Sequence, residues 1–135
     1  MEQIGALDAN FLYTETNSVH NHIASIQILE LPAGQTAKDF IEGLRQVISD
    51  RRHLVPYLTR KLRYTSMNMD HPFWVEDKQF NIDNHIYEVP VETAATSEAG
   101  FSKLQEKIAE LHAVPMDRSK PLWSMQVITG FADSK

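Results

Sequence analysis

The chain has 135 residues, of which 42% are hydrophobic, and a net charge of −5 at pH 7. This length fits at most one domain, and the hydrophobic content is that of a protein with a core, not of a disordered segment. The acidic balance argues against a general nucleic-acid-binding protein, and the absence of cysteine excludes disulfides and thiolate chemistry. No apolar run is long enough to span a bilayer and no secretory signal opens the sequence, so we expect a cytoplasmic protein.

The first half of the sequence predicts a short helix, a strand and a long helix. Residues 7–13 have the pattern of a helix capped by Asp8, and residues 23–31 alternate between apolar and polar positions as a strand does. Thr36, with Asp39 three residues later, is close to a capping box and predicts a helix start. The apolar stripe of that helix consists of Phe40, Ile41, Leu44, Val47 and Ile48.

Three further strands follow in the middle of the chain. Two short strands are predicted at residues 60–65 and 72–76, joined by a polar stretch. A third is predicted at residues 81–91, where Pro90 suits a strand end or a sheet edge because it cannot donate to a ladder. A polar link at residues 92–97 then leads to the last part of the chain.

The last part predicts a helix and a strand. Residues 98–112 place their large apolar side chains at helical spacing, and residues 122–131 alternate as a strand with Trp123 on the same side as Met125. Gly130 and the residues after it have the composition of a hairpin turn whose return strand is missing. The order β-α-β-β-β-α-β predicts an α+β fold, a mixed sheet with helices on one side. Because the sequence stops on a strand and a turn, we expect a larger parent protein.

No catalytic or metal-binding motif is evident from spacing alone. His20 and His22 would point the same way on an extended segment, but no third ligand has suitable spacing, so we predict no metal site. The sequence contains neither a nucleophile elbow nor a phosphate-binding glycine loop. Trp74 and Trp123 are either core residues or substrate contacts, and core is the favoured interpretation for a tryptophan in an alternating strand.

A basic cluster stands out in this acidic chain. Arg60, Lys61 and Arg63 are candidates for contact with an anion, such as the phosphates of a coenzyme or an anionic membrane surface. The favoured interpretation is a solvated strand edge, where cations also prevent unwanted strand pairing. Asp117 and Arg118 are either an ion pair that fixes a turn or two exposed, unpaired turn residues.

Several sequence blocks occur in an order that is typical of a known family. The most specific is residues 111–123, which contains a Pro-Leu-Trp motif at Pro121, Leu122 and Trp123. The other blocks are LDANFLYTET at 7–16, HLVP at 53–56, RKL at 60–62, HPFWV at 71–75 and FNIDNHI at 80–86. Together they resemble the N-terminal part of the bacterial wax ester synthase/acyl-CoA:diacylglycerol acyltransferase family, and the likeness covers nearly the whole chain.

The resemblance implies a fold similar to chloramphenicol acetyltransferase and to condensation domains, in which two α/β halves enclose a tunnel; residues 1–135 would form part of one half. The family moves a fatty acyl group from coenzyme A to a long-chain alcohol or a diacylglycerol. Its motif is His-His-x-x-x-Asp-Gly, whose second histidine is the general base. No His-His pair occurs in this chain. We therefore expect the domain to be truncated before the motif and the chain alone to be inactive, with Pro121, Leu122 and Trp123 in a structural role.

The implied partners are the remainder of the acyltransferase, acyl-CoA as a substrate with no bound cofactor, and a fatty alcohol or diacylglycerol acceptor. Contact with a membrane or lipid-droplet surface and self-association of the fragment are also expected. Two rival interpretations remain. One is a standalone module that binds an acyl chain or a protein without catalysis, and the other is a fragment of a condensation-type domain that uses carrier-bound acyl groups.

Overall fold

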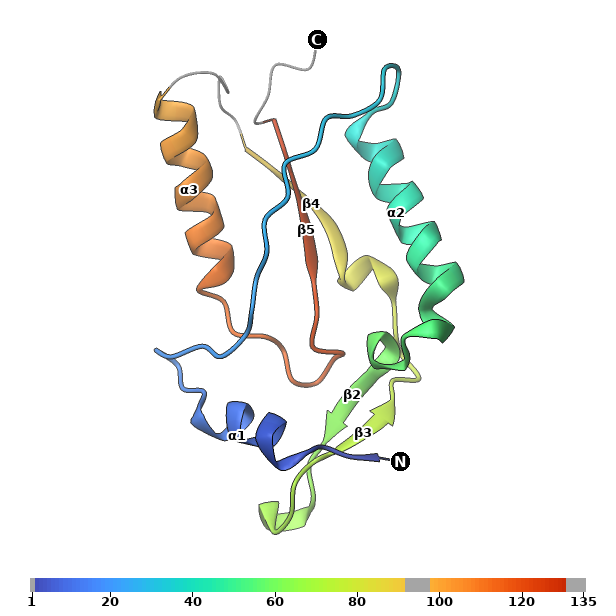
Figure 1. Ribbon diagram of the computed structural model, residues 1–135, viewed down its shortest axis with the longest axis vertical. Coiled ribbons are helices and arrows are strands. Elements are labelled where there is room, and N and C mark those ends of the chain that lie inside the picture. Colours follow the sequence, from blue (N-terminus) through green and yellow to red (C-terminus); the bar gives the residue numbers. More distant parts are fainter. Residues whose placement is uncertain (1, 92–97, 131–135) are drawn as a thin grey trace. The chain divides into compact units, whose positions relative to one another are not determined.

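The computed structural model describes residues 2–91 and 98–130. The contacts of the chain divide it into two units. The first contains the residues up to Ala24, then Arg51–Phe80 and Pro115–Trp123. The second contains Ser25–Asp50, Asn81–Val114 and the residues from Ser124 onward. Figure 1 traces the chain through the helices and strands of both units.

The first unit combines one helix with a small antiparallel sheet. Helix α1 is Ala6–Thr14, and the strands are β1 (Glu2–Gln3), β2 (Arg60–Arg63) and β3 (Phe73–Glu76). The sheet order is β1-β3-β2, with β3 in the middle. Its core is a cluster of apolar side chains brought together from the helix, the sheet and the C-terminal segment. The members are Ile4, Ala9 and Leu62, with Leu12, Trp74 and Leu122 packed against them.

The second unit holds a pair of parallel strands and two long helices. It contains nearly all of α2 (Ala37–Arg51), then β4 (Ile86–Pro90), α3 (Glu98–His112) and β5 (Met125–Thr129). Ile86 pairs with Met125 and Pro90 with Thr129. Arg45 of α2 donates to the carbonyl oxygen of Ile86 from Nε at 3.1 Å and from Nη2 at 2.7 Å, which fixes the helix to the start of β4.

Four short 3-10 turns complete the described elements. They are Arg52–Leu54, Pro56–Thr59, Ser66–Asn68 and Ile82–Asn84.

Several local predictions are confirmed. Thr36 and Asp39 form the predicted reciprocal cap, in which the Thr36 N–H donates to the Asp39 carboxylate at 2.9 Å and the Asp39 N–H donates to Thr36 Oγ1 at 3.2 Å. Helix α3 has both predicted boundaries, and β2 and β3 lie within the two predicted strand ranges. Pro90 ends β4, where its missing N–H costs the ladder nothing. The α+β fold class is confirmed, although the described strands form an antiparallel sheet and a separate parallel sheet where one mixed sheet was predicted.

The predicted strand at residues 23–31 is wrong. The chain there forms no strand, and every one of these side chains is exposed. The alternation of side chains is suited to a strand, but a strand also needs a second backbone to accept its hydrogen bonds. The two-residue strand β1 was not predicted, because two residues are too few to show the alternation of apolar and polar side chains that marks a strand.

Three other boundaries differ from the predictions. Gly5, not Asp8, is the N-cap of α1, and Asp8 lies in the first turn, where its negative charge complements the helix dipole. Strand β4 starts late because the side chain of Asn81 accepts the Asp83 N–H at 3.0 Å and begins a 3-10 turn. The polar link at residues 92–97 and the turn residues after Gly130 lie outside the described residues.

The end of β5 depends on a glycine. Gly130 has φ of +80°, and a Cβ atom there would lie 2.4 Å from the carbonyl oxygen of Val91. The Val91 N–H donates to the Thr129 carbonyl at 2.8 Å, which holds the two backbones at this separation. Any other residue at position 130 must therefore adopt an unfavourable φ and also displace backbone.

Gly130→Ala should lower the free energy of unfolding by roughly 1–3 kcal/mol, because both the positive φ and the backbone clash are unfavourable. Gly43 in α2 is the matched control, since a Cβ atom there would meet nothing within 4 Å and the residue is inside a helix. Gly43→Ala should instead raise stability by about 0.5–1 kcal/mol. Urea unfolding of both variants tests whether the free energy of unfolding falls for Gly130→Ala and rises for Gly43→Ala. Equal changes in the two variants would contradict the assigned role of Gly130.

Candidate functional site

The segment Pro115–Trp123 folds into a turn fixed by Asp117. The Asp117 carboxylate accepts the Ser119 N–H at 2.9 Å and the Ser119 hydroxyl at 2.6 Å, and the Lys120 N–H donates to the Asp117 carbonyl at 3.1 Å. These hydrogen bonds from Ser119, assisted by Lys120, hold the pKa of Asp117 below its usual value. The turn is therefore an aspartate turn, in which a short carboxylate side chain replaces a backbone acceptor.

Arg118 connects this turn to the end of α1. Its guanidinium donates to the Leu12 carbonyl at 2.8 Å, to Glu15 Oε1 at 3.2 Å and to the Tyr64 hydroxyl at 3.2 Å. The last four carbonyls of a helix lack partners within the helix, so a cation at this end satisfies an orphan acceptor and complements the dipole. Neither alternative predicted for Asp117 and Arg118 is correct: each residue is paired, but not with the other.

Asn21 completes the C-terminal end of α1. Its side-chain amide donates to the Phe11 carbonyl at 2.7 Å and to Thr14 Oγ1 at 2.9 Å, and its N–H donates to Glu15 Oε2 at 3.2 Å. Glu15 is only 14% exposed. Burial raises the pKa of Glu15, but the hydrogen bonds from Asn21 and Arg118 outweigh burial, and the pKa lies below its usual value.

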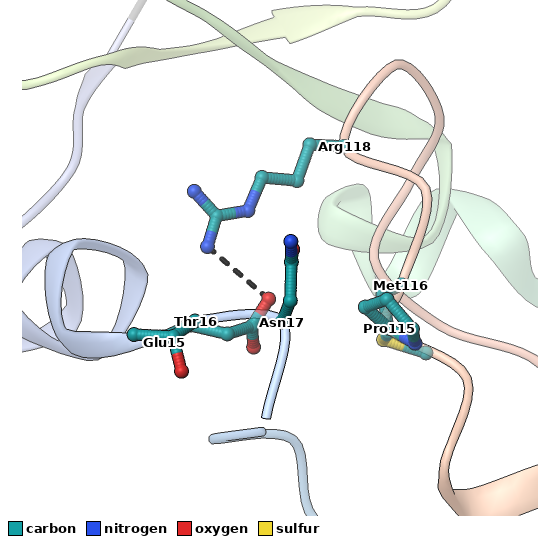
Figure 2. A pocket seen from close by; sticks show the side chains of 6 residues that line it. All are labelled: Glu15, Thr16, Asn17, Pro115, Met116 and Arg118. Atoms are coloured by element: carbon teal, nitrogen blue, oxygen red, sulfur yellow. Dashed lines mark hydrogen bonds and ion pairs between the residues drawn. The ribbon is translucent and has the colours of Figure 1, made fainter. Parts of the chain in front are cut away.

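A cavity of about 310 Å³ lies beside this ion pair. The residues that line it are Glu15, Thr16, Asn17, Pro115, Met116 and Arg118. Figure 2 shows the guanidinium of Arg118 directed toward the carboxylate of Glu15 among the side chains that line the cavity. The volume is at the lower end of the range for small-molecule sites. Its lining contains no histidine or cysteine, so this cavity supplies hydrogen bonds and a paired charge, but no general base of the kind that acyl transfer needs.

The Pro-Leu-Trp residues lie in the turn that precedes β5, not in the strand. Pro121 is buried, Leu122 packs on the core cluster, and the indole N–H of half-buried Trp123 donates to the Leu58 carbonyl at 2.9 Å. The Trp123 N–H donates to the Pro121 carbonyl at 2.9 Å, which closes a tight turn and keeps this residue out of the ladder that starts at Met125. The predicted strand position of Trp123 is therefore wrong.

The predicted anion contact of Arg60, Lys61 and Arg63 stays a prediction. Arg60 forms an ion pair with Glu2 at 3.0 Å, and Lys61 forms one at 2.9 Å with Asp77, whose side chain is 6% exposed. Alternation along β2 directs Lys61 and Arg63 to the side of the sheet opposite Arg60. Arg60 therefore lies on one side of the sheet, and Lys61 and Arg63 lie on the other.

The remaining candidates from the sequence have ordinary surroundings. The rings of His20 and His22 are 5.6 Å apart, and within residues 2–91 and 98–130 no three histidine, cysteine or acidic side chains gather as metal ligands would. Trp74 packs on the core cluster and meets Tyr57 edge to face at 5.4 Å. No described helix is both long and apolar enough to cross a bilayer.

Comparison with known proteins identifies the family. The family model described as the wax ester synthase/diacylglycerol acyltransferase catalytic domain matches residues 4–135. The chain belongs to the wax ester synthase/diacylglycerol acyltransferase family. Two Mycobacterium tuberculosis proteins named as putative diacylglycerol O-acyltransferases are 35% and 30% identical to it, over 99% and 100% of the chain. These alignments cover 26% and 28% of the two relatives, so the chain spans about a quarter of their length.

A solved structure supports the same fold. The wax ester synthase/diacylglycerol acyltransferase from Marinobacter aquaeolei VT8 matches 96% of this chain with a TM-score of 0.66 and 20% sequence identity. The match covers 30% of that protein. The chain thus has the fold of one part of a wax ester synthase, in agreement with the fold that the resemblance implied.

The ion-paired end of α1 could not be located from the sequence. Glu15 and Arg118 are separated by 103 residues, and no local spacing relates two such positions. Asn21 lies between His20 and His22, whose imidazoles were the candidates in the sequence. The contacts with the end of α1 are instead made by the side-chain amide of Asn21. A weak signal was the position of Arg118 beside Asp117, because an aspartate that closes a turn holds the neighbouring side chain in one direction.

Trp123→Ala would cost ~3–5 kcal/mol if the indole were fully buried. Because Trp123 is only half-buried, we expect a loss of roughly 2–3 kcal/mol in the free energy of unfolding. Trp123→Phe, which removes the hydrogen bond to Leu58 and keeps an aromatic ring, should cost about 1 kcal/mol. Urea unfolding of both variants measures the difference, and an unchanged midpoint for Trp123→Ala would contradict the anchoring role.

The Glu15 ion pair should make the protein sensitive to acid. Because the pKa of folded Glu15 is lowered, its contribution is complete above the unfolded value of about 4.3 and is lost as pH falls through the lower folded value. Glu15→Gln should therefore flatten the acid side of the plot of unfolding free energy against pH. In a double-mutant cycle with Arg118→Ala the two effects should not add, because the groups share one contact. Full additivity would contradict the pairing.

Proposed function

We propose that the chain is the N-terminal part of an O-acyltransferase that moves a fatty acyl group from acyl-CoA to a long-chain alcohol or to a diacylglycerol. The observation that carries the proposal is the match of the family's catalytic-domain model to residues 4–135. The fold likeness to a wax ester synthase over 96% of the chain supports it independently. The products would be a wax ester or a triacylglycerol.

In this proposal the chain supplies structure, and the general base lies elsewhere. The sequence has no His-His pair, so the histidine that accepts the proton of the alcohol would come from a His-His-x-x-x-Asp-Gly motif outside these 135 residues. Pro121, Leu122 and Trp123 would shape the approach to that motif without touching substrate. Burial of Pro121, packing of Leu122 and the hydrogen bond from Trp123 to Leu58 support a structural role.

The substrate and surface contacts are part of the same proposal. Acyl-CoA enters as a substrate, not as a resident cofactor, and its phosphates would contact the basic side chains of β2, Arg60, Lys61 and Arg63. The enzyme would work in the cytoplasm, in peripheral contact with a membrane or a lipid droplet. The remainder of the acyltransferase is the main protein partner.

Self-association of the isolated chain is also proposed. Its support is the number of large apolar side chains on the surface of the described residues, with a run of them between residues 23 and 31. Monomeric proteins seldom expose a continuous apolar surface of this kind.

The purified chain should release no coenzyme A above the buffer rate when it is given palmitoyl-CoA with hexadecanol or with dioleoylglycerol, because the sequence lacks the proposed base. An antibody raised to the chain should detect, in the cells that produce it, a species several-fold heavier than 15.4 kDa. That species, captured with the same antibody, should form ester from palmitoyl-CoA and at least one of these two acceptors.

Three results would contradict the proposal. Ester formation by the 135-residue chain would show that the base lies within it. A species of only 15.4 kDa, without activity, would favour the standalone module that binds an acyl chain or a protein. Transfer from an acyl group on a carrier protein, but not from acyl-CoA, would favour the condensation-type alternative.

A further inference from the structure

Residues 23–31 are all exposed, and six of these nine residues are apolar. Ile23 is 97% exposed, Ile28 78% and Ile26 64%. Large aliphatic side chains are rarely left this open in succession, because each costs free energy in water. The segment therefore has the composition of a strand and the exposure of a surface that lacks its partner.

The backbone of this segment is also open. All of residues 23–31 are described, and the structure gives none of them a backbone hydrogen bond, although turns flank the segment at Thr16–Val19 and Pro32–Gln35. An extended stretch with unpaired N–H and C=O groups is a template for an added strand. Main-chain pairing and apolar side chains together would recruit an extended apolar segment.

We propose that residues 23–29 pair with the same residues of a second copy of this chain, antiparallel and centred on Ile26. The proposal rests on the self-association proposed above and assigns its surface and register. In this register Ile26 faces Ile26 of the second copy. The other facing pairs are Ala24 with Ile28, Ser25 with Gln27 and Ile23 with Leu29.

The sequence favours this register over its neighbours. Apolar residues face apolar residues and Ser25 faces Gln27, and such matched cross-strand pairs are the unit of sheet stability. A shift of two residues in one direction places Ile23 against Gln27, and a shift in the other places Ser25 against Leu29. A parallel in-register pair would place Glu30 against Glu30, which is repulsive.

Single cysteine variants can test this register, because the sequence contains no cysteine. Directly opposed residues of antiparallel strands have Cα atoms about 4.5–5.5 Å apart, within the range that a disulfide bridges. Ile26→Cys should therefore give a disulfide-linked dimer under mild oxidation. Ile23→Cys and Leu29→Cys are matched exposed controls, whose own copies would lie roughly 20 Å apart, six residues along the strand.

Ile26→Cys should give at least tenfold more linked dimer than either control alone, and an equimolar mixture of Ile23→Cys and Leu29→Cys should link. Ile26→Lys should weaken dimerisation at least tenfold by light scattering, because two lysines would face each other. Gln27→Lys should weaken it less, because its lysine would face Ser25. All these positions are exposed, so the monomer should fold normally.

The outcomes separate the two levels of the proposal. A dimer that Ile26→Cys does not link would overturn the register and leave self-association intact. Equal linking of all three single variants would indicate parallel pairing and overturn the antiparallel arrangement. A chain that stays monomeric across the concentration range would overturn both self-association and the pairing, without bearing on acyl transfer.

Discussion

The contact between Arg118 and the end of α1 determines much of the first unit. A nine-residue helix leaves four carbonyls without partners at its C-terminus, and burial of such groups is unfavourable unless something donates to them. Here two side chains from distant parts of the chain donate, Arg118 to Leu12 and Asn21 to Phe11. Because Glu15 receives hydrogen bonds from both residues, the donors are held in one geometry. The helix end thus joins three segments of sequence through polar contacts.

The same contact explains why the Pro-Leu-Trp segment has a defined conformation without being a strand. Asp117 closes its turn locally, Arg118 extends to α1, and the indole of Trp123 donates to Leu58. Each contact uses a different part of the segment, so the segment is held within the first unit at three points. The structural role proposed for Pro121, Leu122 and Trp123 rests on these contacts.

Whether a feature could be predicted from the sequence depended on how far apart in the sequence its interacting residues lie. The Thr36–Asp39 cap and α3 depend on residues within a few positions of one another, and both were predicted correctly. The pairing of Glu15 with Arg118 spans 103 residues and carries no local signal, so it could not be predicted. Trp123 has the alternation of a strand residue, but its N–H bonds to Pro121 two positions earlier, and only the backbone geometry reveals this.

Residues 23–31 show most clearly that an alternating sequence pattern is not enough to predict a strand. Alternation describes where side chains would point, and it predicts a strand whether or not a second backbone is at hand. In the second unit the described strands β4 and β5 pair with each other over five residues, and so short a two-stranded sheet is marginal by itself. Parallel strands normally occur in sheets that are covered on both faces. The chain spans about a quarter of its curated relatives' length, and the pairing proposed for residues 23–29 would supply the open segment with a second backbone from another copy of the chain.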